Sequence, residues 1–344
     1  MNTTQQDGLF ARTPVGAGLT VGLMSFAHVH AMGLAQLLLS SGATVLASDP
    51  DAERGRARAA ELGIDYVGDH DALVARGVDG VVITAENSEH RRLTELAAAS
   101  GAAVLSEKPL ALSIADGRAM VEACDRAEVT LMTAFPMRFS PQVQQVAALV
   151  HNGDLGEVVA ISGTNPGSCP GGWFVDPAKS GGGSVIDHTV HVADLMCWLT
   201  GAEPVTVYCQ TNQLITPEYG VETGGLVSVT FANGVFGTID ASWSRLPSYP
   251  TWGGVTLEVV GTEGMVSIDA FGGLAWSSQE GRNPSTRHLR YGPDTSAPLV
   301  TEFLTAIRER RPATPSGLDG LRSTAIALAA YRSAAAGDVV DVDL

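Results

Sequence analysis

The sequence contains few cysteines, and they are scattered. The 344-residue chain has only Cys124, Cys169, Cys197 and Cys209, which show no Cys-x-x-Cys spacing and lie in segments of different character. Neither a zinc knuckle nor a disulfide framework is therefore indicated. This cysteine usage fits a reducing compartment, and we expect a cytoplasmic protein.

Basic residues are also scarce, and long apolar runs are missing. Lys and Arg total 21 against 37 Asp and Glu, a formal net charge of -16, which would repel nucleic-acid phosphates and anionic lipid headgroups. No uncharged apolar stretch reaches about 18 residues, and residues 1–17 lack the basic start and apolar run of a signal peptide. We expect a soluble protein with no nucleic-acid or membrane partner, whose ligand is a neutral or locally cationic small molecule.

What is present is enough chain for two domains with real cores, since 45% of the residues are hydrophobic. Short apolar runs alternate with helical patterns from residue 19 to about residue 135, which indicates a parallel α/β sheet with helices on both faces, a Rossmann domain. We predict a flexible extension over 1–17, a dinucleotide-binding domain over 18–136, and a substrate-binding and oligomerisation domain over 137–344.

The pattern changes after Pro141. Four strand-like segments follow one another without helices between them: EVVAISG, PVTVYCQTNQL, GLVSVTFANGVFGTIDASWS and GVTLEVVGTEGMVSID. The pair Asn233-Gly234 between two alternating runs is a strong hairpin signal. The second domain is therefore predicted to be α+β, with a large, mostly antiparallel open sheet, a helix starting near Asp187 and two helices within 298–335.

The first strand and turn, VGLMSFAHVHA, partly match the dinucleotide fingerprint G-x-G-x-x-G/A. Gly22 and Ala27 take the first and third places, but Met24 stands where the second glycine lets the backbone approach a pyrophosphate. The alternative is an ordinary strand-to-helix turn. Beside it, Phe26 and His28 are predicted either to contact substrate or to pack.

Asp49 supports the cofactor interpretation. It closes the second strand, 22 positions after Ala27, where a carboxylate can accept both ribose hydroxyls of NAD and repel the 2′-phosphate of NADP. Its alternative role is to cap a helix that begins at Ala52. Arg54 and Arg56 lie close by and keep NADP as the less favoured cofactor.

Several motifs in the correct order resemble the Gfo/Idh/MocA family of NAD(P)-dependent sugar and polyol oxidoreductases. Asn87 and His90 match the family's TPNxxH loop, from which Ala85 departs, and Glu107–Pro109 is its EKP motif. His30-Ala31, the Arg-Phe-x-Pro at 138–141 and VVGTEGMVSID also fit. The longest match is WFVDPAKSGGGSVIDHTVHVADLMCWLTG, residues 173–201.

The resemblance implies that Lys108, Asp187 and His191 converge at the nicotinamide as the catalytic set, and that the chain forms a homodimer or homotetramer. The chemistry asks for the same residue types. A neutral imidazole removes the hydroxyl proton while a hydride leaves, a lysine stabilises the developing negative charge, and a carboxylate fixes the substrate or the ring. We expect Gly181–Gly183 to bring backbone close to the ligand. The alternative is that Asp187 only caps a helix and His191 is a buried neutral histidine.

These considerations define the candidate site. The predicted cofactor contacts are Gly22, Met24, Ser25, Phe26, Ala27, Asp49, Ala85, Asn87, His90, Glu107, Lys108 and Arg138. The predicted substrate contacts are Lys108, Arg138, Trp173, Asp187, His188 and His191. Trp173 is equally compatible with core packing, and Cys169 is predicted to be an incidental loop thiol.

The predicted function is an NAD-dependent dehydrogenase that acts on a secondary hydroxyl of a sugar, glycoside or cyclic polyol. Two alternatives stay open: a lyase or glycosidase that oxidises a ring hydroxyl transiently with tightly bound NAD, and a non-catalytic, NAD-loaded sugar sensor. Asp187, His188, His191 and Asp194 have spacings that a metal ion could use, but we expect no metal because nicotinamide chemistry does not need one.

Overall fold

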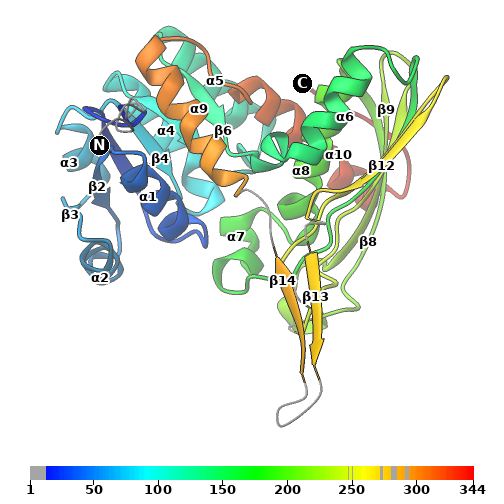
Figure 1. The fold of residues 1–344 in the computed structure, drawn as a ribbon, viewed down its shortest axis with the longest axis horizontal. Coiled ribbons are helices and arrows are strands. Elements are labelled where there is room, and N and C mark those ends of the chain that lie inside the picture. Colours follow the sequence, from blue (N-terminus) through cyan, green and yellow to red (C-terminus); the bar gives the residue numbers. More distant parts are fainter. Residues whose placement is uncertain (1–12, 247, 250, 272–273, 280–284, 291–293) are drawn as a thin grey trace, which may run out of the picture.

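The computed structural model describes residues 13–246, 248–249, 251–271, 274–279, 285–290 and 294–344. Two sheets lie side by side, each with its own helices (Figure 1). Among the described residues, no helix is long and apolar enough to cross a membrane.

The first sheet is parallel throughout, as the alternation of apolar runs and helical patterns predicted. Its strand order is β3 (Asp65–Tyr66), β2 (Thr44–Ser48), β1 (Thr20–Met24), β4 (Gly80–Ile83), β5 (Ala103–Ser106) and β6 (Leu131–Thr133). The order reverses between β1 and β4, and in open α/β sheets ligands bind at such a point, beyond the carboxyl ends of the strands.

Helices cover both faces of this sheet, so both faces are apolar. Along β1, Val21 and Leu23 pack toward one helical layer and Met24 packs toward the other. The first layer holds α1 (Ala31–Ser40) and α2 (Ala52–Leu62), and the second holds α3 (His70–Val74), α4 (His90–Ala99) and α5 (Ile114–Arg126).

A helix from the far end of the sequence completes the first layer. The helix α9 (Ser296–Glu309) lies beside α1 and buries Leu299, Phe303 and Leu304 in the Rossmann core (Figure 1). The pattern of the sequence predicted this helix but gave no sign that it would return to the first domain, because its partners in α1 lie far away in the sequence.

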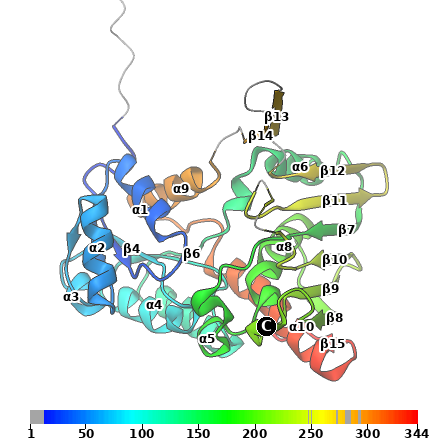
Figure 2. The same cartoon turned by 90° about the horizontal axis from the view of Figure 1, so that it is seen from below.

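The second sheet has the order β12 (Met265–Asp269), β11 (Thr256–Gly261), β7 (Val158–Thr164), β10 (Phe236–Asp240), β9 (Gly224–Phe231), β8 (Pro204–Asn212) and β15 (Val340–Asp341), as Figure 2 shows. Its neighbours pair antiparallel except β7 and β10, which are parallel. The predicted hairpin at Asn233-Gly234 joins β9 to β10, with Gly234 at φ +85°. The mostly antiparallel open sheet is confirmed.

Helices cover one face of the second sheet. These are α6 (Pro141–His151), α8 (Ser184–Thr200) and α10 (Gly317–Ala336), whose apolar side chains form a common core with the inward residues of the strands. The helix predicted near Asp187 begins one turn earlier, at Ser184, so Asp187 lies in the first turn of α8.

Shorter elements join these parts. They are η1 (Asn87–Glu89), η2 (Pro136–Phe139), η3 (Gly172–Val175), α7 (Pro177–Ser180), η4 (Pro217–Tyr219), and the hairpin of β13 (Leu274–Gln279) and β14 (Ser285–Arg290).

Candidate active site

The turn after β1 differs in register from the predicted fingerprint. Gly22 and Met24 lie inside the strand, where a side chain on Gly22 would clash with Leu73, and Met24 is fully buried. Neither residue therefore lies in the turn, where the predicted contact with the cofactor would place it. The turn is made by Ser25–Ala27, and Ser25 has φ +77°, a conformation that normally favours glycine.

The side chain of Ser25 stabilises the conformation that glycine would otherwise supply. Its hydroxyl accepts a hydrogen bond from the backbone N–H of Ala27 at 3.1 Å, and its carbonyl accepts one from the hydroxyl of Thr84 at 2.6 Å. Phe26 points its ring into the Rossmann core, which supports packing over substrate contact for this residue.

Asp49 lies beside this turn at the end of β2. Its Oδ2 accepts the backbone N–H of Phe26 at 2.7 Å, and Arg54 pairs with both carboxylate oxygens at 2.9 and 2.7 Å. Asp51, not Asp49, caps α2, because its side chain accepts the N–H groups of Glu53 and Arg54. The capping alternative for Asp49 is therefore wrong.

The first turn of α1 completes a site that fits a dinucleotide. Its N-cap residue His30 makes no side-chain hydrogen bond to the helix, and uncapped helix N-termini favour phosphate groups. Opposite, Asn87 donates to the carbonyl of Ser180 at 2.8 Å, while its buried Oδ1 has no partner among the described residues. Ala85 is buried just after β4.

His90 supports the Glu107–Pro109 segment from behind. Its Nδ1 lies 2.9 Å from the carbonyl of Pro109, and the ring is fully buried, which lowers its pKa. Because His90 is covered on all sides, the structure gives it a scaffolding position instead of the predicted contact with a cofactor.

The centre of the site is a buried ion pair between the two domains. Lys108, just beyond β5, places Nζ 2.5 Å from Oδ1 and 3.2 Å from the carbonyl of Asp187 on α8. The other oxygen, Oδ2, accepts the indole N–H of Trp243 at 3.0 Å and lies 3.2 Å from His188 Nε2. Burial would raise the pKa of Asp187, but the charge of Lys108 and the contact with His188 hold it well below its usual range.

His191 lies four residues after Asp187 on α8 and lines the adjoining cavity. Its Nδ1 is buried without a partner among the described residues, so Nε2 is the nitrogen that faces the cavity. Burial, and then the positive charge of Lys108, lower the pKa of His191 well below 6.5. The ring is therefore neutral at neutral pH, which a general base requires.

The three glycines before α8 serve the protein, not a ligand. A side chain on Gly182 would lie 2.0 Å from the Tyr331 hydroxyl, and one on Gly183 would lie 2.0 Å from the carbonyl of Glu222. The carboxylate of Glu222 accepts the N–H groups of Gly183 and Val185 and the hydroxyl of Tyr331. Gly182 and Gly183 thus let Glu222 hold the start of α8, and close approach of this backbone to a ligand stays a prediction.

Arg138 occupies a different place from the predicted one. It is buried between the domains and forms ion pairs with Asp194 at 2.6 Å and Asp319 at 3.0 Å, with its guanidinium over the ring of Trp198. Two carboxylates already match its charge, and it is not among the residues that line the cavity. The structure therefore gives Arg138 a structural role at the junction and removes it from the predicted contacts with cofactor and substrate.

Trp173 and Cys169 also lie outside the cavity lining. The indole N–H of Trp173 donates to the carbonyl of Ala27 at 3.0 Å, and its ring stacks on Phe174 at 3.9 Å. Trp173 thereby fastens the second domain to the cofactor turn instead of offering a face to sugar. Burial raises the pKa of the Cys169 thiol, as expected of an unreactive loop cysteine.

Three other side chains gather under the cofactor turn. The side chains of His28, His30 and Glu107 place their nitrogen and oxygen atoms within 4.8 Å of one another. In the described part of the chain, this is the group of side chains that could hold a metal ion. His30 Nδ1 is 3.0 Å from Glu107 Oε1, and burial lowers the pKa of His28 to about 3. The set considered from spacing, Asp187, His188, His191 and Asp194, does not form such a group among the described residues, and Asp194 pairs with Arg138.

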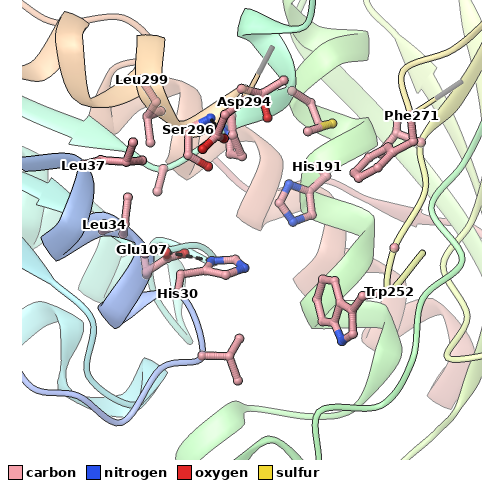
Figure 3. A pocket seen from close by; sticks show the side chains of 18 of the residues that line it. His30, Leu34, Leu37, Glu107, His191, Trp252, Phe271, Asp294, Ser296 and Leu299 are labelled. Atoms are coloured by element: carbon pink, nitrogen blue, oxygen red, sulfur yellow. Dashed lines mark hydrogen bonds and ion pairs between the residues drawn. The ribbon is translucent and has the colours of Figure 1, made fainter. Parts of the chain in front are cut away.

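A cavity of about 820 Å³ opens between the two domains beside these groups (Figure 3). His30 and Glu107 line it from the first domain, and Asn165, His188 and His191 line it from the second. Trp252 also borders the cavity, with about half of its surface exposed. No sequence motif predicted this position for Trp252.

Comparison with known proteins shows two matching family models. One, described as an oxidoreductase family with an NAD-binding Rossmann fold, matches residues 15–135, and the other, the GFO/IDH/MocA C-terminal domain, matches residues 143–267.

Relatives with assigned names match most of the chain. The inositol 2-dehydrogenase of Rhizobium meliloti strain 1021 is 31% identical over 76% of this chain and 80% of its own length. The myo-inositol 2-dehydrogenase of Thermotoga maritima is 27% identical over 91% and 94%. Among solved structures, GenD2 from gentamicin A biosynthesis, in complex with NAD, has a TM-score of 0.84 at 26% identity and covers 95% of this chain and 97% of its own.

The two family models together span more than half of the chain, and the protein belongs to the Gfo/Idh/MocA family of NAD-binding oxidoreductases.

Proposed function

We propose that the protein is an NAD-dependent dehydrogenase that oxidises a secondary hydroxyl of a sugar, glycoside or cyclic polyol. The observation that carries this proposal is the buried Lys108–Asp187 ion pair next to a neutral, cavity-facing His191. Together they place a proton acceptor and a fixed positive charge at the carboxyl edge of a dinucleotide-binding sheet.

The protein groups divide the work of alcohol oxidation. His191 Nε2 accepts the hydroxyl proton as the hydride leaves the carbon that bears this hydroxyl. Lys108 is 2% exposed and lies outside the cavity lining, with two of its three N–H donors on Asp187, so its positive charge acts through space to stabilise negative charge on the substrate oxygen. Both oxygens of Asp187 are engaged by protein groups, so Asp187 positions Lys108 and does not touch substrate. Bound NAD supplies the hydride acceptor.

The direct test is NADH formation with a panel of inositols, hexoses, anhydrosugars and glycosides, with product analysis. His191→Ala should lose about two to four orders of magnitude in turnover while it keeps its affinity for NAD, because Nε2 contacts only substrate. The matched control is His151→Ala, which removes an exposed histidine of α6 outside the cavity. Product without net NADH would indicate the transient-oxidation chemistry instead, and saturable sugar binding without any product would indicate a sensor.

The pH dependence follows from the lowered pKa of His191. A base with a lowered pKa stays unprotonated to lower pH, so kcat/KM for oxidation should show no inflection near 6.5 and should fall only as the pH drops further. NMR titration of the histidine rings in the NAD complex would locate the transition. Lys108→Met should raise the pKa of His191, since the positive charge is removed, but burial should still keep this pKa below 6.5. A His191 transition at 6.5 in the unaltered enzyme would contradict this assignment.

We also propose that NAD binds more tightly than NADP, because the carboxylate of Asp49 lies at the end of β2 where it repels a 2′-phosphate. Asp49→Ser should free Arg54, which now pairs with it, and strengthen NADP binding about tenfold or more. Calorimetry on Asp49→Ser and on Asp49→Ser/Arg54→Ala would show whether the gain depends on Arg54. Equal affinities for both cofactors in the unaltered protein would disprove the preference.

The open face of the second sheet supports assembly into a dimer or tetramer. Leu226 on β9 and Phe236 on β10 are 59% and 52% exposed there, and apolar groups gathered on an uncovered sheet face are typical of an interface. Leu226→Glu/Phe236→Glu should give a monomer by light scattering, whereas Leu318→Glu, on the exposed side of α10, should not. A monomeric unaltered protein at micromolar concentration would contradict this proposal.

A further inference from the structure

The cavity continues beyond the catalytic groups along α1. His30 lies at the start of this helix, and Leu37 and Ser40 line the cavity farther along it. At 1.5 Å per residue, Ser40 is about 13 Å from the beginning of the helix. Because α1 leads away from the turn that would hold the pyrophosphate, this far part of the cavity lies outside the region of the cofactor. It is available to substrate.

This far part is lined by leucines of α1 and α9 and by the polar side chains of Gln36, Ser40 and Ser296. Figure 3 shows Leu34 and Leu37 of α1 and Leu299 of α9 on one side, with Trp252 and Phe271 opposite. Leu34 and Leu299 are nearly covered. The apolar surface that a ligand would meet comes mainly from the more exposed side chains of the lining, Leu37 and Trp252 among them.

Two large apolar side chains of the lining are open to solvent. Val29 is 55% and Trp252 is 49% exposed. Trp252 lies between the domains, with its ring 6.3 Å from the rings of both His30 and His188, nearly perpendicular to each. Aromatic side chains that lose water on binding contribute strongly to affinity. A ligand that covers Trp252 and Val29 would gain this contribution.

The polar and apolar parts of the cavity differ in the ligand groups that they can bind. Asn165, His188 and His191 of the second domain offer hydrogen-bonding groups near the ion pair. A ring with hydroxyls on all sides would also leave hydroxyls against leucine and tryptophan, where an unpaired polar group is unfavourable. None of the described lining residues is Lys or Arg, so a phosphorylated sugar would find no positive charge there.

We propose that the substrate is a glycoside with an uncharged apolar aglycone, aryl or alkyl, and that the aglycone binds over Trp252 and Val29. The sugar ring is then held at His191 and Asn165. The inference rests on the proposed function, since it assigns the substrate class of the same site.

The test compares methyl and phenyl β-glycosides of the same sugar, using glucose, galactose and xylose, with octyl β-D-glucoside and myo-inositol alongside. For a sugar that is oxidised, kcat/KM should be about tenfold or more higher for the phenyl than for the methyl glycoside. Trp252→Ala should bring this ratio close to one. Leu318→Asn, which changes an exposed leucine outside the cavity, should leave it unaltered.

Equilibrium binding to the NAD complex of His191→Ala separates the two proposals. A phenyl-over-methyl preference in binding, without turnover by the unaltered enzyme, would refute the dehydrogenase and retain the aglycone site. Oxidation of methyl and phenyl glycosides with equal kcat/KM, or of myo-inositol alone, would overturn the aglycone inference and leave the dehydrogenase standing. Absence of both binding and turnover across the panel would refute both.

Discussion

The ion pair between Lys108 and Asp187 is the interaction on which the site depends. Each residue belongs to a different domain and each side chain is almost fully buried. Removing two charges from water is costly, and a buried pair persists only when further hydrogen bonds complete it. Here Trp243 donates to the carboxylate and the carbonyl of Asp187 accepts from the lysine. Loss of either charge would leave the other unpaired, so the pair fixes the relative position of β5 and α8.

The surrounding structure serves to keep this pair in place. Glu222 and Tyr331 hold the first turn of α8, which is possible only because Gly182 and Gly183 leave them room. Arg138, between Asp194 and Asp319, joins α8 to the start of α10. Burial raises the pKa of Asp194 to about 6, against the attraction of Arg138. These contacts are buried and specific, which explains why they lie in the most recognisable motifs of the sequence without touching a ligand.

Much of the fold could be predicted from periodicity, since strands and helices alternate in the first half and strands follow one another in the second. The position of α9 could not, because its partners are distant in sequence. In the site, motifs with fixed spacing indicated Lys108, Asp187 and His191, which the structure brings close together, and their catalytic role stays a prediction. The register of the cofactor turn could not be predicted from the motif. Ser25 takes the left-handed conformation that usually marks a glycine, whereas Gly22 lies inside β1.

Trp173 and Trp252 differ in whether a sequence motif includes them and in whether they border the cavity. Trp173 belongs to the longest motif that resembles the family, yet its indole N–H donates to the carbonyl of Ala27 and its ring stacks on Phe174. Trp252 belongs to no motif, yet it borders the cavity. The reason for the difference is physical. Residues of a motif with fixed spacing contact one another within a rigid scaffold, whereas a residue at the edge of the cavity is constrained by the ligand that it contacts. Motifs can therefore predict the residues that build the scaffold, but they cannot predict a residue such as Trp252 that borders the cavity outside them.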